Sequence, residues 1–426
     1  MKPQVILDIA YLGHSHDRQS VRRGTERVAS HLFCGLVESG QCELSFAATS
    51  HLAGAFDFLT ARGIPPANNL RFSPVQLRAS RFGRRLSKIV HRNLENRSLP
   101  ARASRRMLAA AASICTIGEL RLSPAMLQSA DIYHSINTPF PSAVKAQRGL
   151  KKFITLHDFM PLTAPEYFSA GHRRFIDRLL DSLTPETFAF CISEATRNDA
   201  LNFSHLRPEN IFVTPLAADQ IFFHQVTSPE TITAVRTRCR VPAGPYFLAL
   251  SAHDRHKNFP HLIHCFGALI EAGELLDTSL VIVGPHPERN PEVAGALAKY
   301  PRARSRIIIA GFVPDENLAA LYSGATAFLF PSLMEGFGIP PLEAMQCGTP
   351  IIASNTTSIP EVVGDAGILL PPTDRDAWCQ AMLQVSRQES LRAELRQKSL
   401  ARCQLFSWPR FIEETLRGYR KCLDMK

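Results

Sequence analysis

Two glutamates flank a glycine-bearing loop in the stretch Pro331 to Asp365, which is PSLMEGFGIPPLEAMQCGTPIIASNTTSIPEVVGD. Glu335 lies in the loop. Glu343 lies in the first turn of a helix that we expect to open at Pro340 and Pro341, where proline is tolerated. Free N–H groups and the positive end of a helix dipole favour a phosphate at such a point. Because carboxylates accept hydrogen bonds from vicinal hydroxyls, one glutamate could hold a ribose and the other a sugar ring. The spacing therefore predicts a nucleotide-sugar pocket.

Strands and a short helix must position this loop. The apolar run Thr326 to Phe330 predicts a buried strand before the loop, and Pro350 to Ala353 predicts a second strand after the helix. Gly336 and Gly338 allow the backbone to approach a ligand closely, and Gly348 stands where a helix end favours glycine. A simpler interpretation also fits the spacing, namely a capped loop in which one glutamate balances the helix dipole.

The sequence EGFGIPPLEAM, followed by GTPIIASNTTSIPEVVGDAG, resembles the donor-site motif of retaining glycosyltransferases of the GT-B fold, family 4. The resemblance implies an α/β protein with two Rossmann-like parallel-sheet domains that face each other across a cleft. It also implies a nucleoside diphosphate sugar as co-substrate, with no metal and no cofactor. Glu343 would then hold the donor ribose, and Glu335 would contact the transferred sugar. The donor phosphates would be bound by the main-chain N–H groups of Gly336, Phe337, Gly338 and Ile339.

Cations that could neutralise a departing diphosphate follow the expected strand Tyr246 to Leu250. Lys257 matches the phosphate-binding lysine of the family. The family's arginine, which stands several residues earlier after a glycine, is absent, because Ser251 and Ala252 occupy that place. Arg255 either substitutes for this arginine or is a surface charge, and both interpretations remain open.

A histidine follows the expected strand Phe153 to Leu156, and in open parallel sheets ligands gather at the carboxyl ends of strands. The segment TLHDFMPLTAPEYF is similar to the family's segment whose histidine approaches the acceptor and the reacting carbon. His157 is therefore expected to be catalytic, with Asp158 on the acceptor side. A purely structural histidine is the alternative. The segment CISEATRND resembles the family's Ser-Glu segment, which adds Ser193 and Glu194 to the acceptor side.

Two further loops complete the expected donor site. The polar stretch Gly13 to Gly24 leads into a helix, so Gly24 and Thr25 are expected to face the donor phosphate. This stretch resembles the family's more glycine-rich loop only loosely. On the other side of the cleft, backbone groups of Phe312 and Val313 are expected to lie against the nucleotide base.

Alternating strands and helices predict parallel sheets and a division into domains. Residues 1–220 are expected to form an N-terminal, acceptor-binding, Rossmann-like domain. Residues 221–405 are expected to form a C-terminal, nucleotide-sugar-binding, Rossmann-like domain, and residues 406–426 a helix that returns to the N-terminal domain. Residues 220–243 lack strong periodicity, so we expect the connection between the two domains there.

Composition fits a water-soluble globular protein, with 45% hydrophobic and 20% charged residues among 426. The net charge of +10 favours anionic partners. The ten cysteines are scattered without a Cys-x-x-Cys pair, which is typical of reduced cytosolic thiols. No apolar run approaches the about 20 residues of a membrane helix, and the start of the chain does not resemble a signal peptide. We therefore expect a cytoplasmic protein, or one peripheral on the inner face of the plasma membrane.

Residues 71–106 are dense in arginine and lysine, with apolar residues interleaved at helical spacing. A basic amphipathic helix of this kind can dock on an anionic membrane surface. A solvated surface helix is the alternative. Nucleic acid is not expected as a partner, because no recognition module accompanies the charge.

The resemblance implies a retaining, metal-independent hexosyltransferase that moves a sugar from a nucleoside diphosphate sugar to a hydroxyl of a glycan acceptor. A lipid-linked surface polysaccharide is the expected acceptor. A general likeness to polysaccharide mannosyltransferases favours mannose from GDP-mannose. Two alternatives stay open: a soluble acceptor, as in sucrose synthases, and a non-catalytic partner subunit. A dehydrogenase is disfavoured because no Gly-x-Gly-x-x-Gly follows the first strand.

Overall fold

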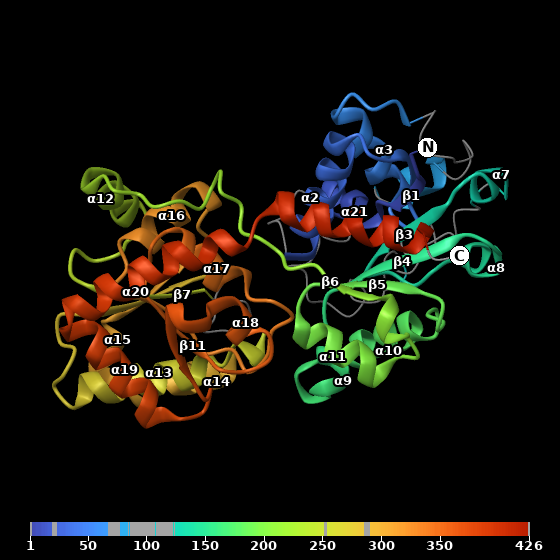
Figure 1. Ribbon diagram of the computed structural model, residues 1–426. Coiled ribbons are helices and arrows are strands. Elements are labelled where there is room, and N and C mark those ends of the chain that lie inside the picture. Colours follow the sequence, from blue (N-terminus) through green and yellow to red (C-terminus); the bar gives the residue numbers. More distant parts are fainter. Residues whose placement is uncertain are drawn as a thin grey trace.

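The computed structural model describes residues 2–18, 24–66, 77–83, 85, 107, 122, 124–250, 254–284 and 290–424. These residues form two halves, each built on a six-stranded parallel sheet with helices on both faces (Figure 1). We call the half with β1 to β6 the first half and the half with β7 to β12 the second half. The prediction of an α/β fold with two Rossmann-like sheets is confirmed.

The first half has the strand order β2-β1-β3-β4-β5-β6. Its strands are β1 (Gln4–Asp8), β2 (Glu43–Ala47), β3 (Ile132–Ile136), β4 (Lys151–Leu156), β5 (Phe188–Cys191) and β6 (Ile211–Val213). Its helices are α1 (Ala10–Arg18), α2 (Gly24–Ser39), α3 (Leu52–Ala61), α7 (Pro124–Gln128), α8 (Ser142–Ala146), α9 (Met160–Thr163), α10 (Ala170–Leu180) and α11 (Glu194–Phe203), with short 3₁₀ turns η1 (Pro165–Tyr167) and η2 (Pro208–Asn210).

The second half has the order β12-β11-β10-β7-β8-β9, which is the doubly wound order of dinucleotide-binding folds. Its strands are β7 (Tyr246–Leu250), β8 (Ser279–Val283), β9 (Ile307–Gly311), β10 (Ala327–Phe330), β11 (Ile351–Ser354) and β12 (Gly367–Leu370). Its helices are α12 (Pro229–Arg238), α13 (Phe259–Glu271), α14 (Pro291–Lys299), α15 (Pro301–Arg304), α16 (Asp315–Ser323), α17 (Ile339–Gln346), α18 (Ile359–Val363), α19 (Arg375–Arg387) and α20 (Glu389–Arg402), with 3₁₀ turns η3 (Arg255–Lys257), η5 (Gly364–Ala366) and η6 (Cys403–Leu405).

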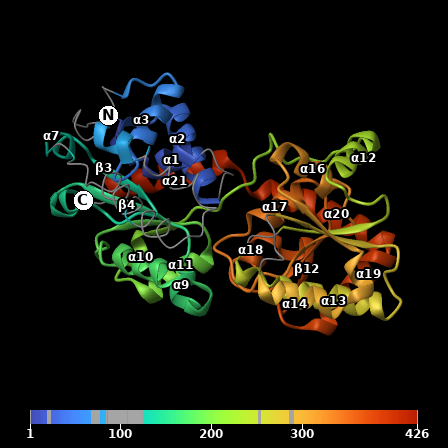
Figure 2. The same cartoon turned by 180° about the vertical axis from the view of Figure 1, so that it is seen from behind.

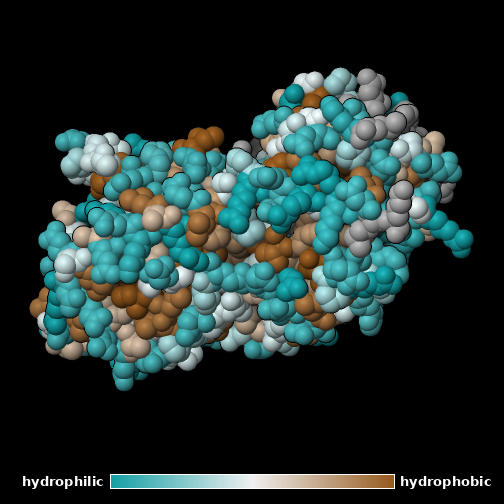
Figure 3. All heavy atoms as spheres, viewed as in Figure 1, coloured by the Kyte–Doolittle hydropathy of each residue, from teal (hydrophilic) through white to brown (hydrophobic). Residues whose placement is uncertain are grey.

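Continuous apolar runs form the central strands because helices bury them on both faces, as Figure 2 shows from behind. All five residues of β8, SLVIV, are buried. On the face shown in Figure 3, hydrophilic side chains cover most of the surface. Every described cysteine is a free thiol.

The last helix, α21 (Trp408–Asp424), leaves the second half and packs on the first (Figure 1). Gly418 lets it approach the sheet, because an added Cβ there would lie 2.5 Å from Phe190 Cε1. The buried Tyr419 hydroxyl shares a hydrogen bond with His134 Nδ1 of β3. Burial lowers the pKa of His134 to about 3, so this histidine is neutral. The chain thus crosses twice between the halves, once after β6 and once before α21.

One local expectation was wrong. The first part of the polar stretch Gly13 to Gly24 is not a loop, because α1 begins at Ala10 and packs against α3. Gly13 fits this contact, since an added Cβ would lie 2.6 Å from His51 O. Residues 220–243 contain the helix α12, which Ser228 caps by accepting a hydrogen bond from the N–H of Thr231 at 3.1 Å.

Most of the basic segment 71–106 lies outside the described residues. Residues 77–83 within it are helical, and Phe82 is 57% exposed beside exposed Arg78 and Arg81. Within the described ranges, no helix combines the length and apolar character that crossing a bilayer requires.

Candidate active site

The second sheet has a switch point between β7 and β10, where ligands bind outside the carboxyl ends of the strands. Lys257 follows β7 and Glu335 follows β10. Lys257 Nζ lies 2.6 Å from Glu335 Oε1 and 5.4 Å from the ring centre of Phe330. Both side chains are largely buried. The topology therefore brings together the lysine predicted for the diphosphate and the glutamate predicted for the transferred sugar.

The loop after β10 is held by hydrogen bonds to the next strand's loop. The N–H of Glu335 donates to Thr357 Oγ1 at 2.9 Å, and Ser358 Oγ donates to the carbonyls of Glu335 and Phe337 at 2.9 and 2.7 Å. Gly338, with φ of 124°, then turns the chain into α17. Pro340 and Pro341 stand in the first turn of this helix, as expected. The loop is therefore fixed before any ligand binds.

Gly336 touches the first half of the molecule. Ser193 Oγ donates to the Gly336 carbonyl at 2.8 Å. A Cβ added at Gly336 would lie 2.5 Å from His157 O and 3.1 Å from Asp158 Cβ. The glycine is thus required by the backbone of the opposite half, whereas the sequence had suggested close approach to a ligand. Phe337, by contrast, buries its ring against Phe406 at 5.9 Å between centroids.

His157 follows β4 and is buried at this contact. Its carbonyl accepts a hydrogen bond from Thr196 Oγ1 at 3.0 Å, while its Nε2 has no hydrogen-bond partner among the described residues. Burial lowers the pKa of His157 to about 4, so the imidazole is neutral at physiological pH. A neutral, buried ring with an unpaired nitrogen is suited to hydrogen bonding with a substrate.

Asp158 lies beside His157, and its Oδ1 accepts a hydrogen bond from the N–H of Met160 at 3.2 Å. Burial, aided by the negative charges of Glu335 and Asp199, raises the pKa of Asp158 to about 6. The carboxylates of Asp158 and Glu335 therefore interact from opposite halves. The structure brings these predicted residues to one place with His157 and Ser193.

Glu194 is placed differently from the other predicted acceptor-side residues. Its exposed side chain pairs with Arg197 on the surface of α11 at 3.4 Å. Only its backbone reaches the interface between the halves. The N–H groups of Glu194 and Ala195 each donate to the Glu361 carboxylate of α18 at 2.7 Å. Glu361 thereby caps the start of α11 from the second half.

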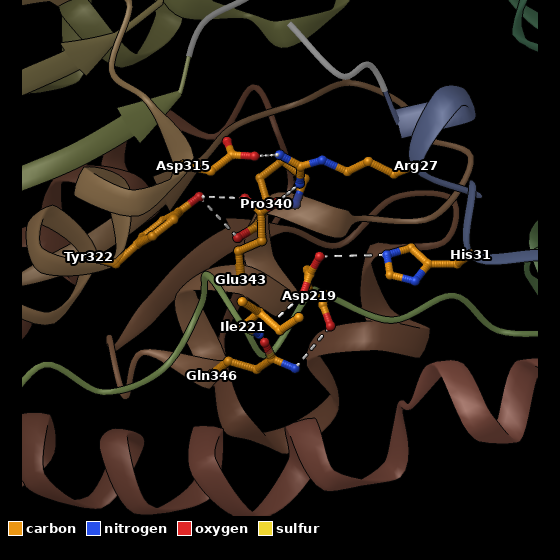
Figure 4. Close-up of polar contacts among 10 residues, drawn as sticks. Arg27, His31, Asp219, Ile221, Asp315, Tyr322, Pro340, Glu343 and Gln346 are labelled. Carbon is orange, nitrogen blue, oxygen red and sulfur yellow. Dashed lines mark hydrogen bonds and ion pairs between the residues drawn. The ribbon is translucent and has the colours of Figure 1, made fainter. Parts of the chain in front are cut away.

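Glu343 is buried on α17, 3% exposed, and both of its oxygens have partners (Figure 4). Arg27 of α2 reaches across from the first half and pairs with Oε1, while the Tyr322 hydroxyl donates to Oε2 at 3.2 Å. Arg27 also contacts Asp315 Oδ2 at 2.7 Å. Burial raises the pKa of Glu343 to about 7, and the positive charge of Arg27 limits that rise. Sequence analysis missed Arg27, whose only local signal is its place one turn after Gly24.

Of the other predicted donor-site residues, Gly24 lies close to the start of α17. At the start of α2, Gly24 faces Ile339, since an added Cβ would lie 3.6 Å from Ile339 Cδ1, and Thr25 is its neighbour. Phe312 is 60% exposed after β9, whereas Val313 is buried. The predicted contacts of the first pair with a phosphate and of the second pair with a base stay predictions.

Arg255 is directed to other partners. Its guanidinium pairs with Glu292 at 2.6 Å and lies 5.9 Å from the ring centre of Tyr167. Ser251 and Ala252, which stand in place of the family's arginine, lie outside the described residues. Across the described ranges, no group of three or more His, Cys, Asp or Glu side chains is placed to hold a metal ion.

The chain is similar to known glycosyltransferases. Residues 244–388 match the family model described as glycosyl transferases group 1. The chain is 30% identical over 290 residues to O-antigen chain mannosyltransferase B of Escherichia coli, covering 68% of this chain and 74% of that protein. It is 28% identical over 276 residues to the serotype-specific mannosyltransferase WbdA of E. coli, covering 64% of this chain but only 34% of that longer protein.

The fold is similar to that of Anabaena Alr3699/HepE, whose structure was solved in complex with UDP and glucose. The TM-score is 0.64 at 15% identity, and the match covers 99% of this chain and 100% of the other. At this identity the likeness concerns the fold alone, and it confirms the GT-B arrangement. The relative at 30% identity, together with the family model, shows that the chain belongs to the glycosyl transferases group 1 family.

Proposed function

We propose that this glycosyltransferase moves a hexose from a nucleoside diphosphate sugar to a glycan hydroxyl with retention of anomeric configuration and without a metal ion. The observation that carries the proposal is the convergence of two sets of groups. His157, Asp158 and Ser193 of the first half meet Glu335 and its glycine-bearing loop of the second half. The reacting carbon would lie at this junction.

Each group has a role that its surroundings support. Lys257 neutralises charge on the diphosphate as the sugar–oxygen bond breaks, and the N–H groups of Gly336 to Ile339 add to this. Glu335 accepts hydrogen bonds from the transferred sugar once the donor enters beside Lys257. His157, neutral and with an unpaired Nε2, hydrogen-bonds the sugar or the acceptor. Cations and N–H groups of the chain neutralise the diphosphate, as a metal ion does in metal-dependent enzymes.

The reaction requires no covalent sugar–enzyme intermediate. The acceptor hydroxyl attacks the anomeric carbon on the face from which the diphosphate leaves, and the leaving phosphate oxygen takes the hydroxyl proton. This front-face course retains the configuration. The ion pair of Glu335 with Lys257 supports it, since a carboxylate held by a cation is a weakened nucleophile.

The relatives' names support mannose as the transferred sugar and an O-antigen polysaccharide as the acceptor, and GDP-mannose is the donor that we propose. A lipid-linked acceptor would place the protein at a membrane. The exposed Phe82, which follows the exposed Arg78 and Arg81, supports docking through residues 71–106. Co-sedimentation with anionic but not neutral vesicles tests this docking. Equal sedimentation with both vesicle types would reject it.

The activity is tested by incubating the protein with GDP-mannose and either a mannose-terminated, lipid-linked oligosaccharide or free sugars. Proton NMR then identifies the anomeric configuration of the product. We expect an α-mannoside on the lipid-linked acceptor. A β-mannoside would reject retention, whereas transfer only to free sugars would favour the soluble-acceptor alternative. If the protein binds the donor and transfers nothing, the partner-subunit alternative gains support.

A further inference from the structure

Arg27 joins the two halves at Glu343, whose carboxylate is predicted to hold the donor ribose. One guanidinium nitrogen pairs with Glu343 Oε1, and another lies 2.7 Å from Asp315 Oδ2. The side chain of Arg27 is 15% exposed and that of Glu343 is 4% exposed, so water screens this pair weakly. Figure 4 shows Arg27 approaching from α2 while its two partners belong to α16 and α17.

We propose that Arg27 is a positioning residue of the donor site, which keeps Glu343 ionised and fixes one of its oxygens so that the remaining lone pairs accept the ribose hydroxyls. This inference rests on the proposed function, in which Glu343 holds the donor ribose. It adds a charged side chain of the first half to a donor site for which Gly24 and Thr25 were the predicted first-half residues.

The need for Arg27 follows from the burial of Glu343. Removing a carboxylate from water favours the protonated form, unless a nearby cation compensates. A protonated carboxyl group gives up part of its acceptor capacity and so binds vicinal hydroxyls less well. Tyr322 donates one neutral hydrogen bond to Oε2, which leaves Arg27 as the cation in contact with this carboxylate among the described residues.

The other charged groups around Glu343 do not replace Arg27. Asp315 of α16 acts against ionisation, because its negative charge raises the pKa of Glu343. Cys347 lies one turn further along α17, and burial raises the pKa of its thiol, so it stays neutral. The nearby His31 of α2 pairs instead with Asp219, at 3.7 Å between Nε2 and Oδ2.

Because Arg27 and Glu343 belong to different halves, the charge on the ribose carboxylate depends on their approach. In an open arrangement Glu343 would lose its cation and the donor site would lose affinity. In the closed arrangement the site is complete. Because of this ion pair, the protein binds the donor tightly only when the two halves are closed.

A purely structural bridge would behave differently from a positioning residue, and Asp315 provides the distinction. If the Arg27 bridge only ties the halves together, Arg27→Gln and Asp315→Asn both break it and both weaken donor binding in the same direction at every pH. If Arg27 sets the charge of Glu343, the two substitutions shift the pH dependence of binding in opposite directions.

The test is isothermal titration calorimetry with GDP-mannose, and with UDP-glucose as a second probe, between about pH 6 and 8.5. A diphosphate diester keeps its charge over this range, so the dependence reports on the protein. The variants are Arg27→Gln, Arg27→Lys, Asp315→Asn and Glu343→Ala. Arg387→Gln is the matched control, since Arg387 belongs to an exposed ion pair with Glu274 far from the site. Melting temperatures show which variants are folded.

We expect wild-type affinity to fall as the pH drops through about 7. In Arg27→Gln the midpoint moves to higher pH, with about a fivefold loss of affinity at pH 7 for the first pH unit of movement and about tenfold for each further unit. Arg27→Lys restores part of the affinity, Asp315→Asn moves the midpoint down, and Arg387→Gln changes nothing.

Two results would separate this inference from the proposed function. A pH-independent loss in both Arg27→Gln and Asp315→Asn would overturn the positioning role while leaving the donor site intact. Undiminished binding by Glu343→Ala would reject the ribose assignment itself. Failure of the wild-type protein to bind either nucleotide sugar would reject both.

Discussion

The contact at Gly336 predicts that a single methyl group will slow transfer by separating the two halves. In Gly336→Ala the new Cβ would lie 2.5 Å from His157 O, and the backbones must part by about 0.9 Å to reach ordinary van der Waals contact. Neither neighbour is a flexible side-chain end, so no rotamer change relieves the clash. The same movement weakens the 2.8 Å hydrogen bond between Ser193 Oγ and the Gly336 carbonyl.

Overpacking of this kind costs about 1–3 kcal/mol. Because the clash exists only when the halves are closed, this energy shifts the opening equilibrium by about 5-fold to 150-fold. We expect the rate of sugar transfer, measured as release of nucleoside diphosphate, to fall by a factor in that range. Circular dichroism should show an unchanged secondary structure, since the clash lies between the halves.

Gly295→Ala is the matched control for this experiment. Gly295 lies within α14, and an added Cβ meets nothing within 4 Å. Alanine is favoured over glycine in a helix by about 1 kcal/mol, so stability should not fall and transfer should continue at the wild-type rate. A Gly336→Ala protein that matches this control within twofold would refute the view that His157 must approach the Gly336 loop for transfer.

Three further predictions follow from the site and the core. Lys257→Ala should lower kcat by about 100-fold to 1000-fold, as for loss of one group that stabilises a developing anion, and near-normal turnover would reject its role. Dialysis against EDTA should leave transfer unchanged, whereas a loss that Mg²⁺ or Mn²⁺ restores would contradict a metal-independent reaction. Gly418→Ala should lower the melting temperature, because the added Cβ lies 2.5 Å from Phe190 Cε1 and overpacking costs about 1–3 kcal/mol. An unchanged melting temperature would show that α21 can shift without cost.

The sequence was most informative where local chemistry alone decides the structure. Strands such as β8 are nearly continuous apolar runs. The helix α17 has two prolines in its first turn and ends shortly before Gly348, whose φ is 70°. Such features depend on burial and backbone preference within a few residues. The helix α1 was missed because its sequence is largely polar and shows no clear helical pattern. What stabilises it is a tertiary contact, the packing of Gly13 against α3.

The site was predictable only within each half. Glu335 and Lys257 could be assigned because each follows a buried strand whose carboxyl end faces the switch point. The partnership of Arg27 with Glu343 joins residues 316 positions apart, and no spacing rule reaches that far. The requirement for glycine at Gly336 was likewise set by the opposite half, so its cause could not be found in the loop's own sequence.

The central claim is that the closed junction binds a nucleoside diphosphate sugar through Glu343. A thermal-shift screen against UDP, GDP, dTDP, ADP and their sugar conjugates, with wild type and Glu343→Ala compared, tests it most directly. A ligand at one hundred times its dissociation constant adds about 2.7 kcal/mol to the free energy of unfolding, which raises the melting temperature measurably. We predict a rise with one nucleotide and its sugar, lost in Glu343→Ala. No rise with any of these ligands, or an equal rise in the variant, would contradict the account.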